Sequence, residues 1–246
     1  MKTMCLAAGT LPCEAALALE NDEITLFRLA PHPGLRPEEA CHPDMQVAVL
    51  PDGRVVAAPG TELPGIVKYD PGTAVLTPVY PKNIPYNVLI AGSVYFHPAG
   101  ATDPVLAAGL AAAGIRQANV RQGYAGCSGI CVYDPCGEPL LLSGDAGIIR
   151  KAEAEGVAVQ FCRGVENIVL PGFDHGFVGG CCGYLERDGR RTLYTIGRME
   201  ETFYNYDEIK NALDRAEVEV RSLAGGRLQD HGGLKFICPG AEASPA

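Results

Sequence analysis

The feature that most constrains this chain is a short unit of secondary structure that recurs five times along it. Each unit reads as a helix, then a strand, then a β-hairpin. The clear helices begin at Asp103, at Asp145 and at about Tyr206, and each has a capping residue or apolar residues at helical spacing. Fainter helical patterns cover 12–19 and 62–69. Helices therefore start at intervals of roughly 40 to 60 residues, which is typical of repeat architectures.

Strand and hairpin signals accompany the helices. A strand-like run follows each helix, at 24–29, 74–79, 117–121, 157–162 and 218–223. The hairpins then pair 47–50 with 54–57, 88–90 with 93–96, 130–133 with 140–142, and 183–186 with 192–196. Two of them turn through Asp-Gly, at 52–53 and 188–189, a dipeptide that favours a tight hairpin turn.

The fifth hairpin is only half present, because 233–238 is followed by a tail rich in Pro, Gly and Ala. The N-terminal strand 3–8 has no other partner, so it can pair there and close the units into a ring, which removes an exposed edge. We predict an α/β fold, a five-fold pseudosymmetric β/α-propeller closed by the N-terminal strand. Residues 1–240 would form a single domain and 241–246 a flexible tail. An ordinary mixed α/β sandwich is the alternative.

Composition and charge narrow the function classes. With 246 residues, 47% of them hydrophobic, the chain can bury a substantial core. Its net charge of −9 argues against a nucleic-acid partner and suits a small cationic ligand. No run reaches the roughly 18 apolar residues of a membrane span, and Pro12, Cys13 and Glu14 interrupt a faintly signal-like N-terminus. We expect a cytoplasmic protein without membrane contact, and the sequence leaves a homo-oligomer open.

The ten cysteines are scattered over a chain too long to need disulfide staples, so we expect reduced thiols. Their spacing differs from that of a zinc ribbon. Cys127 and Cys131 on one strand would lie about 13 Å apart, and the adjacent Cys181 and Cys182 would point to opposite faces. We therefore predict that the protein has no metal site. The chain also has no phosphate loop, dinucleotide fingerprint or Gly-x-Ser-x-Gly turn, so no cofactor is expected.

Several polar and glycine-rich segments have a familiar order and spacing. They are CHPD (41–44), YPKNIPYN (80–87), QGYAGCS (122–128), SGD (143–145), GFVGG (176–180) and LQD (228–230). Together they resemble an uncharacterised bacterial family assigned to the guanidine-group-modifying, or pentein, fold. The resemblance spans roughly 42–236. It implies a five-bladed β/α-propeller whose hairpin-strand entrances point side chains into a central funnel.

The resemblance also implies a type of chemistry. Active pentein enzymes such as arginine deiminase, agmatine deiminase and the amidinotransferases use a Cys nucleophile, a His general acid and base, and carboxylates that hold a guanidinium group. The uncharacterised family that this chain resembles has no established reaction. A small guanidino or amidino compound is therefore the ligand class that we expect.

His42 and Asp44 resemble the His-x-Asp element that enters a strand in deiminases. In an extended segment, side chains two residues apart share one face, so the imidazole and the carboxylate would reach the same cavity. We expect catalysis from His42 and cation binding from Asp44. The alternative is that both residues only cap the entrance of a hairpin.

Two cysteines are candidates for the nucleophile. Deiminases place a Cys shortly after a Gly-Gly pair near the C-terminus, but here Phe236 stands three residues after Gly233 and Cys238 comes two residues later. Either Cys238 takes the role through a local shift or the usual nucleophile is absent. Cys127 lies in a Gly-Cys-Ser segment at a hairpin entrance, where it could attack a ligand or simply fill a buried position.

The remaining candidates lie at other hairpin entrances. Asp174 and His175 precede a glycine-rich stretch, where His175 could replace or join His42, although a surface turn explains them as well. Asp230 matches the family, and we expect it in the cavity. Tyr86 and Asn87 could add a ring face and an amide to a cation site.

Two functions from different classes follow. The first is a Cys/His-dependent hydrolase or transferase that acts on a small guanidino or amidino compound through Cys127 or Cys238. The second keeps the ring without catalysis, as a small-molecule-binding or interaction module. The displaced C-terminal Cys favours the second function.

Overall fold

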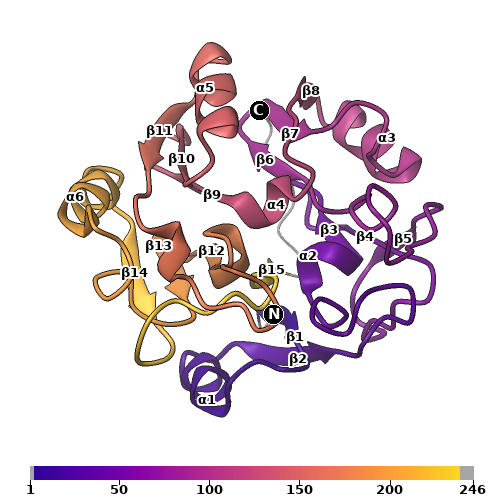
Figure 1. Cartoon of the computed structure of the whole chain (residues 1–246), viewed down its shortest axis with the longest axis horizontal. Coiled ribbons are helices and arrows are strands. Elements are labelled where there is room, and N and C mark those ends of the chain that lie inside the picture. The colour runs from indigo at the N-terminus through magenta and orange to yellow at the C-terminus, as the bar shows by residue number, and fades with distance from the viewer. Residues whose placement is uncertain (1–2, 239–246) are drawn as a thin grey trace.

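The computed structural model describes residues 3–238, which form a ring of five β-sheets (Figure 1). Each sheet has three strands, in which two form an antiparallel hairpin and the third joins parallel to the middle strand. The five sheets are called blades 1 to 5 in ring order. The predicted α/β fold, a five-fold pseudosymmetric β/α-propeller, is confirmed. The predicted tail, 241–246, lies outside the described residues.

The strands occupy three positions in every blade (Figure 1). From blade 1 to blade 5, the inner strands are β15 (Lys235–Ile237), β3 (Val47–Val49), β6 (Leu89–Ala91), β9 (Gly129–Tyr133) and β12 (Cys182–Arg187). The middle strands are β1 (Met4–Ala8), β4 (Val55–Ala57), β7 (Val94–His97), β10 (Pro139–Ser143) and β13 (Arg190–Thr195). The outer strands are β2 (Thr25–Leu29), β5 (Tyr69–Pro71), β8 (Arg116–Asn119), β11 (Ala158–Phe161) and β14 (Glu219–Ser222).

Four helices connect middle to outer strands on the periphery of the ring: α1 (Cys13–Asn21), α3 (Pro104–Ala112), α5 (Ala146–Ala154) and α6 (Tyr206–Arg215). They match the helices that the sequence predicts in blades 1, 3, 4 and 5. Asp103 caps α3 by accepting from the backbone N–H groups of Val105 and Leu106, and Asp145 caps α5 in the same way. These carboxylates satisfy N–H groups that a helix start leaves without partners.

Blade 2 departs from the predicted pattern. The expected helix at 62–69 is absent, because Pro64 and Gly65 favour a turn there, which is closed by a hydrogen bond from Val67 N to Pro64 O. The expected strand at 74–79 is also wrong, since β5 occupies the place beside β4. The N–H groups of Thr73 and Ala74 instead donate to Asp103 Oδ2, each at 2.7 Å.

Short helical turns precede three of the inner strands. They are α2 (Pro43–Gln46) before β3, α4 (Ala125–Ser128) before β9, and the 3-10 helix η2 (Gly179–Cys181) before β12. A further 3-10 helix, η1 (Val165–Asn167), follows β11. The prediction that His42 and Asp44 lie on an extended segment is therefore wrong. Pro43 at the first helical position favours a helix there, so His42 precedes α2 and Asp44 lies within it.

The two ends of the described chain meet in blade 1. Strand β1 pairs antiparallel with β15, in the register Met4 with Ile237 and Leu6 with Lys235, and parallel with β2. The predicted closure of the ring by the N-terminal strand is confirmed. Blade 1 is thus held together by hydrogen bonds between segments more than two hundred residues apart.

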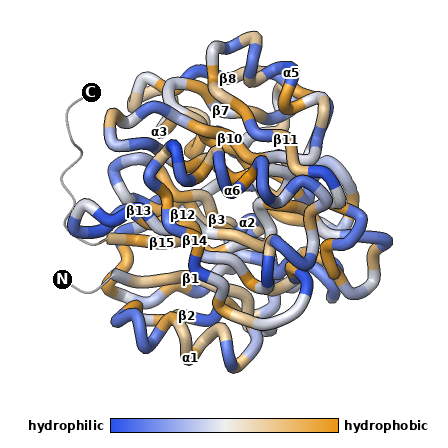
Figure 2. Tube along the Cα trace, turned by 90° about the vertical axis from the view of Figure 1, so that its left-hand side faces the viewer, coloured by the Kyte–Doolittle hydropathy of each residue, from blue (hydrophilic) through white to orange (hydrophobic). Residues whose placement is uncertain are grey.

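The hydrophobic core is divided among the interfaces between neighbouring blades. In Figure 2 the strands in the middle of the molecule are mostly hydrophobic and the outer loops mostly hydrophilic. Five clusters of buried side chains each join two adjacent blades. Residues from the two sides of each interface that share a cluster are, going round the ring from blades 1 and 2, Leu6 and Val47, Val56 and Tyr95, Phe96 and Leu141, Leu142 and Leu193, and Tyr194 and Cys5.

Within residues 3–238, none of the helices combines the length and the apolar character needed to cross a lipid bilayer.

Closure through β1 should be visible in the stability of the protein. Leu6 is fully buried between blades 1 and 2, so Leu6→Ala should lower the free energy of unfolding by about 2 to 5 kcal/mol in urea titrations. Leu17 on α1 is 60% exposed, so Leu17→Ala should change the free energy of unfolding by no more than about 0.5 kcal/mol. Equal effects of the two substitutions would contradict the closure described here.

Candidate functional site

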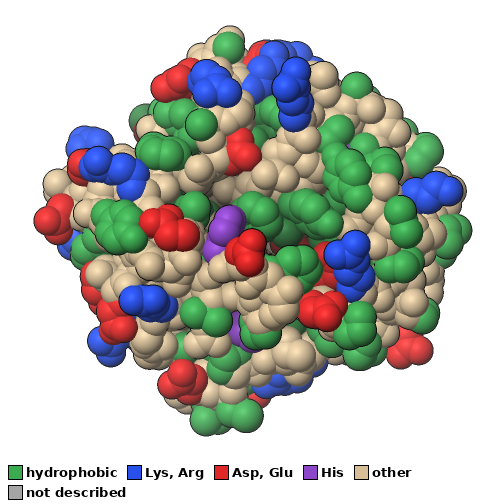
Figure 3. Space-filling model, viewed as in Figure 1, with side chains coloured by type: hydrophobic (Ala, Val, Ile, Leu, Met, Phe, Trp, Pro, Cys, Tyr) green, Lys and Arg blue, Asp and Glu red, His purple; other side chains and the backbone are tan. Residues whose placement is uncertain are grey.

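The entrances to the inner strands converge on a cavity of about 260 Å³ near the axis of the ring. Figure 3 shows the face that carries its mouth, with hydrophobic side chains around a central hollow beside a histidine and acidic side chains. The cavity is lined by Glu39, His42, Met45, Tyr124, Cys127, Leu170, Phe173, Asp174, His175, Phe177 and Asp230. Segments from blades 1, 2, 4 and 5 therefore contribute to one site.

Glycines allow these segments to approach each other closely. A Cβ atom on Gly180 would overlap the Asp230 carboxylate, and one on Gly179 would overlap the carbonyl oxygens of Gly126 and Gly129. Gly232 has a φ of +75° and lies against the His42 side chain. The glycine-rich stretch 176–180 is thus required by backbone packing around the site.

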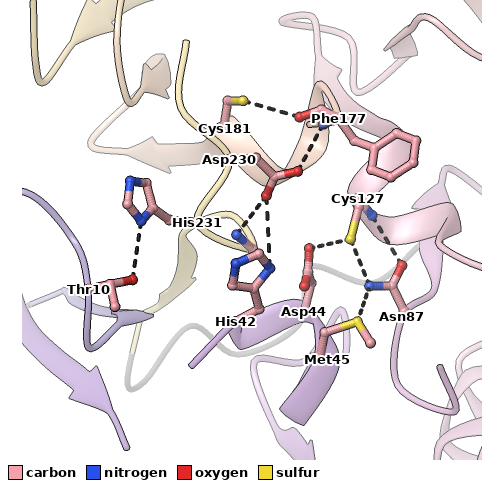
Figure 4. A network of polar contacts seen from close by, with 11 residues as sticks. Thr10, His42, Asp44, Met45, Asn87, Cys127, Phe177, Cys181, Asp230 and His231 are labelled. Atoms are coloured by element: carbon pink, nitrogen blue, oxygen red, sulfur yellow. Dashed lines mark hydrogen bonds and ion pairs between the residues drawn. The ribbon is translucent and has the colours of Figure 1, made fainter. Parts of the chain in front are cut away.

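Cys127 forms part of the floor of the cavity and is tied to two polar side chains (Figure 4). Its Sγ lies 2.9 Å from Asp44 Oδ2 and 3.0 Å from Asn87 Nδ2. The backbone N of Cys127 also donates to Asn87 Oδ1 at 3.1 Å. Burial raises the pKa of the thiol well above its usual value, and the nearby Asp44 carboxylate raises it further. Cys127 therefore rests as a thiol that donates to Asp44.

Asp44 lies behind Cys127 rather than in the cavity lining. Its side chain is almost completely buried, and Oδ1 has no hydrogen-bond partner among residues 3–238. Burial is the largest influence and raises the pKa of Asp44 to about 7, with Lys235 acting in the lowering direction and Asp230 in the raising direction. A carboxyl with this pKa can accept and return a proton near neutral pH.

His42 and Asp230 form the other polar pair of the site (Figure 4). His42 Nδ1 lies 3.9 Å from Asp230 Oδ1, which also accepts from Gly232 N at 3.0 Å, while Asp230 Oδ2 accepts from Phe177 N at 2.8 Å. Burial raises the pKa of Asp230 and lowers that of His42 to about 4. The imidazole of His42 is therefore neutral at pH 7, and Asp230 holds two backbone segments in place.

The thiol and the imidazoles are not paired. Within 3–238 no hydrogen bond joins a cysteine sulfur to a histidine nitrogen, and all ten cysteines are free of disulfides. Cys127 and His42 nevertheless line the same cavity. Cys127 instead donates to the carboxyl group of Asp44, a contact that the sequence did not indicate.

The remaining sequence-predicted residues divide into two groups. Asp174 and His175 lie in the wall of the cavity, and Asn87 supports Cys127 from behind. Tyr86 is buried outside the cavity lining, where its hydroxyl donates to Ala74 O and Asp103 Oδ2.

Cys238 is also remote from the cavity. It follows the far end of β15, and its Sγ lies 3.8 Å from Thr3 Oγ1. His231 lies beside the site with its Nδ1 3.3 Å from Thr10 Oγ1. Of the two predicted nucleophiles, the structure brings only Cys127 to the cavity.

The sequence did not identify Glu39, or the rings of Tyr124 and Phe177, as parts of the cavity wall. Glu39 is 4% exposed, and its Oε1 accepts from Asn83 Nδ2 at 3.3 Å, an amide that also donates to the Tyr124 hydroxyl at 2.6 Å. The rings of Tyr124 and Phe177 lie 6.4 Å apart at 16°. A usable signal existed, because Glu39 and Tyr124 each precede a candidate catalytic residue by three positions.

The site holds more negative than positive groups. Glu39, Asp44 and Asp230 are all buried, and burial raises the pKa of each. No lysine or arginine belongs to the cavity lining or forms an ion pair with these three carboxyls in the described part of the chain. Burying carboxylates without a cation is costly. Among residues 3–238, no three His, Cys, Asp or Glu side chains are grouped to hold a metal ion.

Asp44→Asn should stabilise the protein in a pH-dependent way. Because the folded-state pKa of Asp44 is raised to about 7, the folded protein binds this proton more tightly than the unfolded chain, and ionisation above that pH costs stability. The melting temperature should therefore rise by several degrees at about pH 8 and by much less at about pH 4. Glu138→Gln, at an exposed carboxyl, should give no such difference. If Asp44→Asn raised the melting temperature equally at both pH values, the raised pKa of Asp44 would be contradicted.

Comparison with curated proteins and with solved structures finds no match. Comparison with protein-family models finds one that covers residues 6–235, almost the whole chain and all five blades. That model is described as a family of unknown function, DUF6873. The chain belongs to this family.

Proposed function

We propose that the axial cavity binds a small organic cation with a guanidinium or amidinium group, and that Cys127 attacks the central carbon of that group. The observation that carries the proposal is the set of buried carboxyls, Glu39, Asp44 and Asp230, which form no ion pair with a lysine or arginine in the described chain. A bound cation would supply the missing positive charge in a poorly solvated place, where electrostatic attraction is strong.

The geometry of the lining supports a planar cation. Glu39, Asp174 and Asp230 contribute carboxyl groups to the wall, and Tyr124 and Phe177 contribute ring faces. Carboxylates bind guanidinium groups through charge-assisted hydrogen bonds, and aromatic faces attract cations. The resemblance to guanidine-modifying enzymes in the sequence points to the same ligand class.

The covalent step that we propose uses Cys127 and Asp44. As Sγ attacks the carbon of the ligand, the thiol proton passes to Asp44, which lies 2.9 Å away. The bond from carbon to the leaving nitrogen then breaks, and Asp44 returns the proton to that nitrogen, so an amine leaves and an amidino group stays on sulfur. Water releases the group as a urea or an amide and restores the thiol, while a second amine would make the reaction a transfer.

Further groups of the site have roles in this scheme. Asn87 Nδ2 lies 3.0 Å from Sγ, where its N–H can stabilise the thiolate during attack. A bound cation beside Cys127 would also lower the pKa of the thiol, because an opposite charge favours the ionised form. His42 is neutral at pH 7 and lines the same cavity, where it can accept a proton from the attacking water.

Cation binding without turnover is the second candidate. It is favoured by the raised pKa of the Cys127 thiol and by the lack of a hydrogen bond between that thiol and a histidine in the described residues. An activated cysteine nucleophile normally has a lowered pKa and a neighbouring base. The two candidates share the cation site and differ only in the reactivity of Cys127.

Binding of the cation should depend on Glu39. Glu39→Gln keeps the shape of the side chain and removes its charge, so the affinity for methylguanidinium, measured by calorimetry, should fall by about tenfold or more. Glu38→Gln removes the charge of the exposed neighbour and should change the affinity by less than about threefold. Equal losses from the two substitutions, or no binding to the wild-type protein, would contradict the cation site.

Reaction at Cys127 can be separated from binding with a matched pair of reagents, cationic chloroacetamidine and neutral chloroacetamide. Peptide mapping should show that the cation alkylates Cys127 in preference to the exposed Cys13 and Cys136, and that the neutral reagent reverses this preference. Cys127→Ser should abolish the preferred adduct, whereas Cys238→Ser should leave it intact. Exclusive labelling of Cys13 and Cys136 by both reagents would favour binding without turnover.

A further inference from the structure

We infer that the ligand of the axial cavity carries a flat apolar substituent next to its cationic group and has no carboxylate. The inference deepens the proposed function and rests on it. It follows from two properties of the cavity: the sign of the charges along its wall and the aromatic character of its mouth.

The charges of the wall disfavour a ligand that also bears a negative group. Carboxyl groups lie both on the deeper wall, at Glu39 and Asp230, and near the exposed rim, at Asp174. Within residues 3–238 the lining contains no lysine or arginine. A carboxylate on the ligand would therefore face Asp174 or Glu39, and the repulsion between like charges would weaken its binding.

Two basic side chains influence the carboxyl groups of the site without belonging to its lining. Arg36 influences the pKa of Glu39, but its Nε donates to Pro78 O at 3.2 Å. Lys235 lies on β15, lowers the pKa of Asp44 by its charge, and lines a separate hollow between the inner strands. Neither side chain belongs to the wall of the cavity, so a free amino acid such as arginine would leave its carboxylate unpaired.

The mouth of the cavity offers apolar and aromatic surface instead. Phe173 is 40% exposed at the rim, and Leu170, Tyr124 and Phe177 complete this side of the wall. The rings of Tyr124 and Phe177 are nearly parallel, and the His175 ring meets Phe177 edge-on at 5.7 Å. A flat apolar group attached to the cation would bury against these rings and gain hydrophobic and stacking energy.

The size of the cavity limits this substituent. A volume of about 260 Å³ lies just below the range of roughly 300 to 1,000 Å³ that is typical of pockets for drug-sized ligands. One planar ring beside the amidinium or guanidinium group is therefore the class of ligand that fits. Benzamidine has this form, and 4-amidinobenzoate differs from it only by a carboxylate.

These two probes give a direct test by calorimetry on the full chain. Benzamidine should bind at least about tenfold more tightly than 4-amidinobenzoate, and the ratio should shrink at high salt because screening weakens the repulsion. Methylguanidinium serves as the probe for the cation site itself. If methylguanidinium binds but the two benzamidines bind equally, the inference is overturned while the proposed function stands. If none of the three binds, both fail.

A charge added at the rim provides a second measurement. Phe173→Arg places a cation at the exposed edge of the cavity, so the preference for benzamidine over 4-amidinobenzoate should shrink by about threefold or more. Leu17→Arg adds the same charge on the remote helix α1 and should leave the preference unchanged. An unchanged preference in Phe173→Arg, or an equal change in both variants, would overturn the inference.

Discussion

The pairing of β1 with β15 is the constraint on which the rest of the structure depends. It joins the two ends of the described chain in one blade and leaves every blade with a neighbour on both sides. Apolar side chains are then buried between adjacent blades, in five clusters such as the one around Leu6 and Val47. Because these interfaces supply the core, the axis of the ring is available to polar groups, and the inner-strand entrances bring such groups there from four blades.

Burial at the axis explains the chemistry of the site. Glu39, Asp44 and Asp230 are shielded from water, which raises the pKa of each and favours their protonated forms. The same burial keeps His42 neutral and Cys127 a thiol. Among these acids Asp44, with a pKa of about 7, is the one that can hold a proton near neutral pH and ionise if a cation arrives. The ligand that we propose, which is positive, planar and free of carboxylates, would favour the ionised forms of Asp44 and of the Cys127 thiol.

The sequence predicts those parts of the structure that depend on local patterns. Helix caps at Asp103 and Asp145, the Asp-Gly turns and the unpaired strand 3–8 are local signals, and they were sufficient for the ring and its closure. The third strand of blade 2 was misplaced because the 74–79 run is apolar for another reason: Leu76 packs into the interface between blades 2 and 3. The contact between Asp44 and Cys127 could not be predicted, since 83 positions separate the two residues and only the ring geometry joins them. Glu39 was overlooked because its one signal is its spacing, three positions before His42.

Proton linkage tests the central claim most directly, because it reports on the buried acids themselves. Benzamidine binding should be measured by calorimetry in two buffers with different ionisation enthalpies. At about pH 6 the raised pKa values leave Asp44 largely protonated, so binding of a cation should release a substantial fraction of a proton, and this release should fall toward zero at about pH 9. Binding without proton release at about pH 6 would contradict a site built on buried acids that await a cation.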